Sequence, residues 1–168
     1  MTPSDLEWIL GLDPLVVAAA HKRIASTYNA GPVYPVLARE LGNPALCTVM
    51  RGMLLRIQKS SSRADYHGFA HNIKFKYMMD LWFEQKGRCA VTGQIMSFET
   101  GTHNQKNAYS CSIDRIDSGK GYVEGNVRLL VHWANNAMNT WDDALFESMI
   151  LSAAQLLAAR KVDVPAVI

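Results

Sequence analysis

The sequence predicts an α+β fold that is mostly helical, with a helical N-terminal region and a small hairpin-plus-helix motif in the C-terminal half. Three observations carry this prediction. Residues 1–60 are rich in helix-starting and helix-type apolar patterns, residues 111–130 combine alternating side chains with turn formers, and residues 132–158 return to helical spacing. With 168 residues, 49% of them hydrophobic, the chain is large enough to bury a core of its own.

The first sixty residues read as a series of helices. Pro3 and Pro14 stand where proline favours the first turn of a helix, and each lies beside a residue that can cap it. The segment after Pro44, ALCTVMRGMLLRIQK, is a further helix. No motif in this part of the chain indicates a function.

Residues 60–68 (SSSRADYHG) are polar and are predicted to be a linker. The chain is therefore expected to divide into a helical region of unassigned role, residues 1–65, and a second domain, residues 66–168. After the linker, residues 73–87 have helical spacing, and residues 88–98 (RCAVTGQIMSF) predict a short strand or hairpin.

The ribbon CSIDRIDSGKGYVEGNVRLL, residues 111–130, is the most turn-rich part of the sequence. Its first residues alternate like a strand that ends in carboxylates, SGKG is a turn, and a second strand follows Gly125. A short helix is expected over residues 132–139. A last helix follows, and its apolar stripe is Leu145, Met149, Ala153 and Leu156.

Composition excludes several classes of protein. The three cysteines, at positions 47, 89 and 111, include no close pair, which argues against a disulfide framework and against a four-cysteine zinc site. The N-terminus lacks the basic and apolar regions of a signal peptide, and no uncharged apolar run reaches the length of a membrane span. We therefore expect a reducing, cytoplasmic setting and no membrane partner.

Charge is uneven along the chain. From Arg51 to Arg128 there are twelve lysines and arginines against seven aspartates and glutamates, a net charge of +5. The remaining residues carry five against eight, a net charge of −3. A basic middle suits a polyanionic partner, although ordinary solvated charge explains the same numbers.

Asp114, at the end of the first predicted strand, and Asn135, on the following helix, offer hard oxygen ligands of the kind that Mg²⁺ and Mn²⁺ prefer. If residues 132–139 are helical, His132, Asn136 and Asn139 share a face with Asn135. His132 could then serve as a general base, with His103 as the second candidate. The alternative is that the aspartates, glycines and asparagines simply build a hairpin.

The residues CAVTG (89–93) and SIDRIDSGKGYVEGNVRLLVHWANNAMN (112–139) resemble the HNH, or ββα-metal, nucleases, and in particular their phage and prophage branch. The resemblance covers about residues 72–158. It implies a DNA endonuclease that hydrolyses phosphodiester bonds with Mg²⁺ or Mn²⁺, encoded in a bacterial cell by a phage or prophage. The alternative is an HNH-like protein that binds nucleic acid or a partner and is catalytically silent.

The resemblance also implies roles for single residues. Asp114 and Asn135 would be the metal ligands, and Asn126 would tie the loop between the strands. The basic stretch would follow the nucleic-acid backbone. Its candidate contacts are Lys74, Lys76, Lys120 and Arg128.

The sequence departs from the family pattern at three positions. Arg115 stands where better-known members carry the histidine base, and arginine cannot accept a proton from water. Either a histidine elsewhere supplies the base, or Arg115 clamps the phosphate, or the protein does not cut; a structural ion pair with the flanking aspartates is a further possibility. Thr92 replaces the second cysteine of a zinc-binding pair, so structural zinc is not expected, and Met138 replaces a common lysine.

Overall fold

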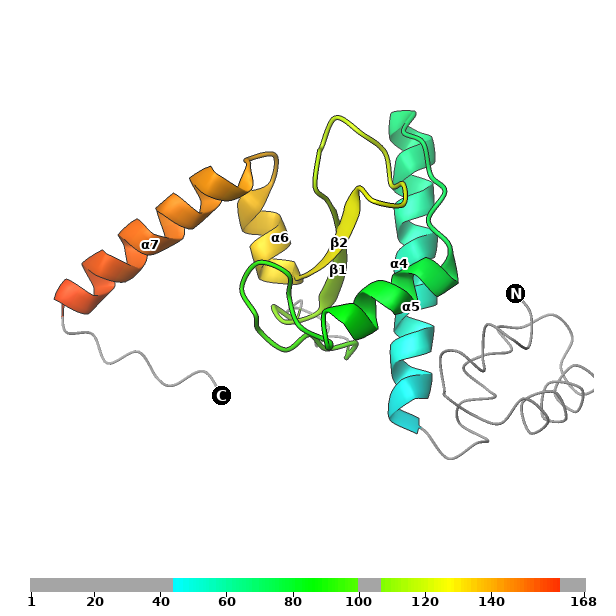
Figure 1. The fold of residues 1–168 in the computed structure, drawn as a ribbon, viewed down its shortest axis with the longest axis horizontal. Coiled ribbons are helices and arrows are strands. Elements are labelled where there is room, and N and C mark those ends of the chain that lie inside the picture. The colour runs from blue at the N-terminus through cyan, green and yellow to red at the C-terminus, as the bar shows by residue number, and fades with distance from the viewer. Residues whose placement is uncertain (1–43, 100–106, 161–168) are drawn as a thin grey trace, which may run out of the picture.

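The computed structural model describes residues 44–99 and 107–160 (Figure 1). The helices expected within residues 1–43 lie outside this part of the chain, as does His103. The described elements are listed in chain order: α4 (Pro44–His67), α5 (Phe75–Glu84), β1 (Cys111–Arg115), β2 (Val127–Val131), α6 (His132–Met138) and α7 (Asp143–Ala159). Helices predominate over one small sheet, so the predicted α+β class is confirmed.

The two strands form the predicted hairpin. β1 and β2 pair antiparallel, with Cys111 opposite Val131 and Asp114 opposite Arg128. α6 begins at His132, directly after β2, and the N–H groups of its first two residues donate to the carbonyl oxygens of Ser110 and Ala108. These bonds satisfy helix-start donors that no side chain caps. The result is a compact strand–strand–helix unit.

The prediction of a linker at residues 60–68 is wrong. α4 runs without a break through His67, and Ser60 and Ala64 are buried. The hydroxyls of Ser60 and Ser62 donate to the helix carbonyls of Ile57 and Gln58, which lets serines remain inside a helix. The division of the chain at residue 65 stays a prediction.

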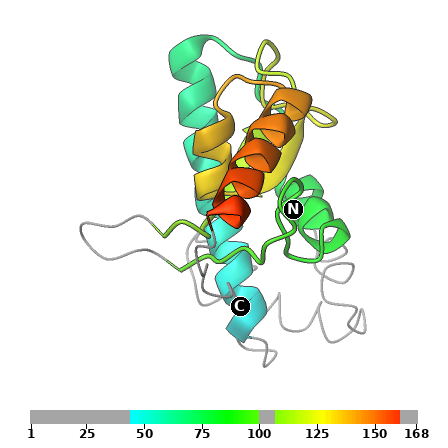
Figure 2. The same ribbon diagram turned by 90° about the vertical axis from the view of Figure 1, so that its left-hand side faces the viewer.

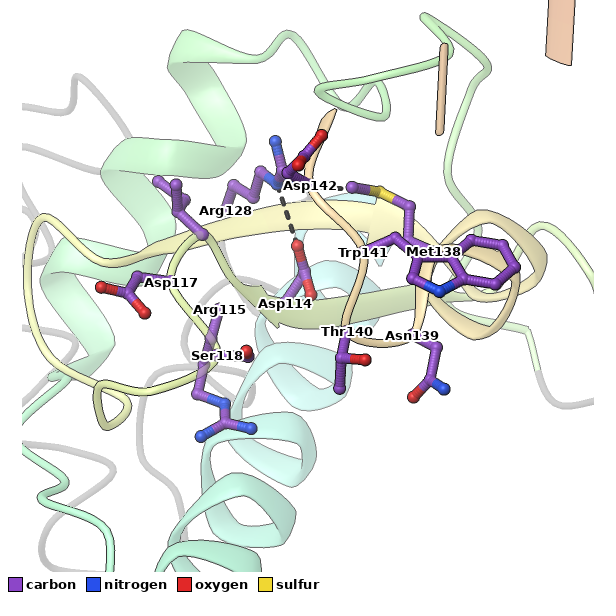
Figure 3. Close-up of a pocket in the computed structure, with 11 residues that line it drawn as sticks. Asp114, Arg115, Asp117, Ser118, Arg128, Met138, Asn139, Thr140, Trp141 and Asp142 are labelled. Atoms are coloured by element: carbon purple, nitrogen blue, oxygen red, sulfur yellow. Dashed lines mark hydrogen bonds and ion pairs between the residues drawn. The ribbon is translucent and has the colours of Figure 1, made fainter. Parts of the chain in front are cut away.

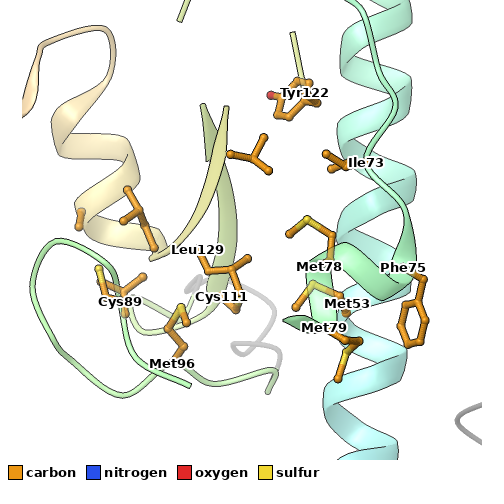
Figure 4. Packing of buried hydrophobic residues seen from close by; sticks show 14 of the residues in the cluster. Met53, Ile73, Phe75, Met78, Met79, Cys89, Met96, Cys111, Tyr122 and Leu129 are labelled. Atoms are coloured by element: carbon orange, nitrogen blue, oxygen red, sulfur yellow. The ribbon is translucent and has the colours of Figure 1, made fainter. Parts of the chain in front are cut away.

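The core lies on both faces of the hairpin. Side chains at alternate positions of a strand face opposite ways, yet Leu129, Leu130 and Val131 are all fully buried. Figure 1 shows the reason: α6 covers one side of the hairpin, and α4 and α5 lie on the other. The large side chains that α4 and α5 bury in this core are mainly methionines, whose flexible side chain fills irregular space (Figure 4). These residues are Met50 and Met53 of α4 and Met78 and Met79 of α5.

The segment 88–98 forms a tight turn that a single bridge between Arg88 and Ile95 closes, as a short hairpin would. Polar side chains fasten it to the strand–strand–helix unit. The indole Nε1 of Trp133 donates to Oε1 of Gln94 at 2.7 Å. The amide of Gln85 bonds both backbone groups of Leu129, at 3.0 Å to its N–H and 2.8 Å to its carbonyl. The turn and the end of α5 therefore hold β2 from outside the sheet.

The three cysteines are buried and unpaired. Burial raises the pKa of the Cys111 thiol to about 12, so it has no thiolate character at neutral pH. Cys47 and Cys111 act as small core residues. No helix within residues 44–99 and 107–160 has the length and apolar character that crossing a membrane requires.

Candidate functional site

A network of charges joins the hairpin to α7. Nε of Arg128 donates to Oδ2 of Asp114, its partner across the strands, at 2.9 Å (Figure 3). The other guanidinium nitrogens of Arg128 donate to both carboxylate oxygens of Asp143, each at 2.7 Å. The side chains of Asp114 and Arg128 are only 11% and 13% exposed. One arginine therefore pairs with two carboxylates, Asp114 of β1 and Asp143 of α7.

The surroundings shift these carboxyl groups in opposite directions. Burial raises the pKa of Asp114, and the hydrogen bond and charge of Arg128 offset only part of that rise. The bidentate hydrogen bonds from Arg128 lower the pKa of the more exposed Asp143. Asp143 keeps its charge, whereas Asp114 is a carboxylate whose ionised form depends on a nearby cation.

Asp114 and Arg128 lie at a cleft of about 270 Å³ (Figure 3). One wall is formed by residues 114–118, which run from the end of β1 into the following loop. The opposite wall is formed by residues 138–142, the link between α6 and α7. The lining is mostly polar, with three carboxylates, two arginines and three hydroxyl or amide side chains. The cleft is thus suited to a charged, hydrated ligand rather than to an apolar one.

Asn126 holds the loop that forms the first wall. Its amide oxygen accepts the N–H of Asp117 at 3.0 Å, and its amide nitrogen donates to the carbonyls of Asp117 and Gly121 at 3.1 and 2.9 Å. This is the tie that the resemblance implies for it. Gly121 packs so closely on Ala70 that a Cβ there would lie 2.1 Å from the Ala70 carbonyl oxygen. Glycine is therefore required at this position.

Arg115 lines the cleft and is held by an aromatic surface. The carbon at the centre of its guanidinium lies 4.2 Å from the ring centroid of Phe69 and 5.3 Å from that of Tyr122. Nη1 donates to the carbonyl of Lys120 at 3.0 Å. Among the described residues no ion pair joins it to a flanking aspartate. The interpretation of Arg115 as a structural ion pair is wrong, because stacking holds its side chain instead.

Asn135 lies beside β1, although it does not line the cleft. Its amide nitrogen donates to Oγ of Ser112 at 3.0 Å and to the carbonyl of Ile113 at 3.3 Å. Asn139 lines the cleft instead. α6 ends at Met138, and Asn139 has a φ of +50°, so it leaves the helical path and the expected four-residue face is broken.

His132, the first candidate base, does not line the cleft. His132 is the first residue of α6, and its Nε2 is 3.1 Å from the amide nitrogen of Asn136, the helical neighbour predicted for it. It is absent from the lining of the cleft, and His103 lies outside the described residues. The titratable groups that the described part of the chain places at the cleft walls are carboxylates and arginines.

The predicted nucleic-acid contacts fall into two groups. Lys74, Lys76 and Lys120 are exposed, with Lys76 paired to Asp80 and Lys120 paired to Asp117, both at 3.1 Å. Arg128 is nearly buried and is held by carboxylates on both sides, so its guanidinium already has its partners. Of these three lysines, Lys120 pairs with a residue of the cleft wall, Asp117.

Sequence reasoning missed two contributors to the site, Thr140 and Asp143, whereas Asn139 was already a candidate from its expected helix face. Asn139 and Thr140 line its second wall, and Asp143 anchors Arg128. The pairing of Asp114 with Arg128 had a readable signal, because a hairpin with this turn places them opposite each other. No signal in the sequence indicates the position of Asp143, because only the three-dimensional path of the α6–α7 link brings it close to Arg128.

The donor set at the cleft fits a hard divalent ion that binds few protein ligands. In the part of the chain that the structure describes, no three His, Cys, Asp or Glu side chains form a metal-binding group by themselves. The cleft offers oxygens from Asp114, Asp142, Asn139 and Thr140. Mg²⁺ commonly uses one or two carboxylates and completes its octahedron with water and substrate phosphates.

Comparisons with known proteins give one likeness of fold. No family model matches the sequence, and no curated protein matches it. A similar solved structure is that of the rare-cutting HNH restriction endonuclease PacI, with a TM-score of 0.47 and 17% identity. The match covers 66% of this chain and 82% of that one.

Replacing Arg128 with methionine removes the cation that faces Asp114. We expect the free energy of unfolding at pH 7 to fall by about 3 kcal/mol, because a buried carboxylate loses its partner. This decrease in the free energy of unfolding should become smaller as the pH falls toward 4. The folded-state pKa of Asp114 lies above the unfolded value of about 3.9, so its contribution to stability is present at low pH and is lost as the pH rises through the folded-state pKa.

Urea unfolding of Arg128→Met at several pH values measures this effect. Lys76→Met is the matched control, because it removes an exposed cation whose partner Asp80 keeps its solvent contact. Equal destabilisation of Arg128→Met at pH 4 and pH 7 would contradict the assignment of Arg128 as the cation that stabilises the ionised form of Asp114.

Proposed function

We propose that the chain is a metal-dependent endonuclease that hydrolyses phosphodiester bonds in DNA, with Mg²⁺ or Mn²⁺ bound at Asp114. The observation that carries the proposal is a nearly buried carboxylate at the end of β1 that lies at a polar cleft between two arginines. The strand–strand–helix unit and the sequence resemblance over residues 72–158 support it. A cytoplasmic location and a phage or prophage origin belong to the same proposal.

Asp114 would hold the ion, and the resemblance adds Asn135 as a second ligand. Asn135 turns its amide nitrogen toward β1, so its amide oxygen is the end left for a cation. Asp142 and Asn139 offer further oxygens at the cleft. A divalent ion bound there supplies positive charge to the scissile phosphate and to the leaving 3′ oxygen.

Arg115 is proposed to clamp the phosphate. Its ring contacts and its bond to Lys120 use one face and one N–H of the guanidinium, and arginine has five N–H donors. A planar fork that is already held in place loses little entropy when it binds a phosphate. The exposed Lys120, Lys74 and Lys76 would follow the DNA backbone at longer range.

Of the three interpretations of Arg115, the geometry favours the clamp. His132 is the first histidine to consider as a base, but it does not lie at the cleft, whereas Arg115 does. Asp117 and Asp142 are the other carboxylates within the walls, and either can orient a water that attacks the phosphate.

A second function has its own observation. Asp114 is already bonded to Arg128, and no histidine within residues 44–99 and 107–160 lines the cleft. A protein that uses this surface to bind nucleic acid without cutting it would have these properties. Only a cleavage assay separates the two functions.

The central test is the cleavage of supercoiled plasmid DNA with Mg²⁺ or Mn²⁺. We expect nicking by the unchanged protein, and a fall of at least about 100-fold in Asp114→Asn, because a proposed metal ligand is lost. Asp80→Asn is the matched control, since Asp80 is a carboxylate on α5 that faces solvent. DNA binding without cleavage under either metal would overturn the nuclease and leave the binding protein.

A second pair of variants distinguishes a clamp from a histidine base. We expect Arg115→Ala to lower cleavage by roughly 100-fold, as the loss of a donor to a developing charge does in other enzymes, and Arg115→Lys to restore part of it. His132→Gln should keep cleavage within about tenfold of the unchanged protein, since the loss of a general base costs 10²–10⁴-fold.

The dependence of the cleavage rate on pH provides the readout for the histidine. If His132→Gln abolishes a rate limb near pH 6.5, the ordinary pKa of histidine, His132 is the base and the clamp interpretation fails.

A further inference from the structure

Ring side chains form a row at the C-terminal end of α4. Tyr66 is 85% exposed, more than any other large hydrophobic side chain of the described residues. Its ring meets that of His67 edge-on, with the centroids 4.8 Å apart, and the next centroid, that of Phe69, lies 5.9 Å from His67. Phe69 in turn stacks on Arg115, which lines the cleft. The row therefore runs from open solvent to the cleft wall.

A helix cap holds this row in place. Gly68 follows α4 with a φ of +71°, and the N–H of Phe69 donates back to the carbonyl of Ala64 at 2.9 Å, as in a common helix ending. The next residues join the loop between the strands, since the N–H of Asn72 donates to the carbonyl of Tyr122 at 3.0 Å. Figure 1 and Figure 2 both show the end of α4 at the same end of the fold as this loop. The rings are therefore fixed beside the cleft before any ligand binds.

Basic side chains continue the row along one side of α4. Arg56, Lys59 and Arg63 precede Tyr66 at intervals of three and four, which places all of them on one side of a helix. The one acidic residue of α4, Asp65, lies two positions after Arg63 and therefore faces elsewhere. Lys59 and Arg63 are exposed, and neither forms an ion pair among the described residues. Their charge is thus available to a ligand.

This side of α4 follows β1 from one end to the other. Nε of Arg56 donates to the carbonyl oxygen of Cys111, the first residue of β1. At the other end the row of rings reaches Arg115, the last residue of β1. The two exposed cations lie between these points on the helix. A line of positive charge therefore runs beside the hairpin and ends at the rings and the cleft.

Cations and exposed rings attract different parts of a nucleic acid. Lysine and arginine bind phosphates of any strand, paired or unpaired. An exposed ring face stacks on the face of a base, and in a duplex the neighbouring base pairs cover both faces of each base. A basic track that leads to rings is therefore typical of surfaces that bind a single strand.

We infer that Tyr66 and His67 stack an unpaired nucleobase beside the cleft, while Lys59 and Arg63 bind phosphates of the same strand. The inference rests on the proposed function for the phosphate at Arg115, and it narrows the substrate to DNA that is single-stranded where it is cut. Negative supercoiling favours strand separation, so a supercoiled plasmid offers such stretches.

Fluorescence anisotropy with a labelled DNA strand of roughly 16 nucleotides and with its blunt duplex, both in EDTA so that nothing is cut, tests the stacking. We expect tighter binding of the single strand. Tyr66→Ala should weaken that binding by roughly tenfold and duplex binding by less than about twofold, because it removes a ring that only an unpaired base can reach. Tyr66→Trp should keep the preference. Tyr109→Ala is the matched control, since Tyr109 is an exposed tyrosine before the start of β1.

The salt dependence of single-strand binding separates the phosphate contacts from the stacking. Lys59→Gln and Arg63→Gln should each lower the slope of log K against log salt by about 0.7, the loss of one phosphate contact. Tyr66→Ala should weaken binding with the slope unchanged. Lys86→Gln is the control, because Lys86 is an exposed cation that follows Gln85 on the β2 side of the hairpin. Circular dichroism melts show that each variant keeps the fold.

Equal or tighter binding of the duplex overturns the inference, and so does a Tyr66→Ala variant that binds the single strand as the unchanged protein does. These outcomes are separate from the failure of the nuclease. If single-strand binding depends on Tyr66 and no DNA is cut with Mg²⁺ or Mn²⁺, the single-strand site stands and the nuclease fails. If the plasmid is cut and Tyr66→Ala changes neither binding nor cleavage, the nuclease stands and the single-strand site fails.

Discussion

The interaction on which the site depends is the bridge that Arg128 makes between Asp114 and Asp143. It joins the two strands at the end where the chemistry is proposed, and it fixes the first turn of α7 against them. A carboxylate that is 11% exposed stays charged only beside a cation. A divalent ion held by Asp114 would share this carboxylate with Arg128, and the two hydrogen bonds to Asp143 would keep Arg128 in place.

The remainder of the fold positions this bridge. Asn126 and Gly121 set the loop on one side of the cleft. Gln85 and Trp133 hold β2 and α6 from outside the sheet with hydrogen bonds. A core rich in methionine covers both faces of the hairpin. Packing and amide hydrogen bonds thus give a two-stranded sheet the rigidity that it lacks alone.

Much of the hairpin could be predicted from the sequence, because alternation and turn residues are local signals. The loop tie by Asn126 followed from the resemblance, and its hydrogen bonds are present. Residues 60–68 were misread because serine looks like a linker residue until its hydroxyl bonds its own helix. The positions of the site residues depend less on local sequence signals. Asn139 leaves α6 with a positive φ, and Asp143 reaches Arg128 through the path of a loop, which no spacing along the chain encodes.

The central claim is that Asp114 holds a divalent ion at the cleft. Crystals grown with duplex DNA and Mn²⁺, measured at the manganese absorption edge, test it most directly. The account predicts an anomalous peak roughly 2.2 Å from a carboxylate oxygen of Asp114, between residues 114–118 and 138–142. The absence of a peak there, with DNA bound and Asp114 still bonded to Arg128, would contradict it.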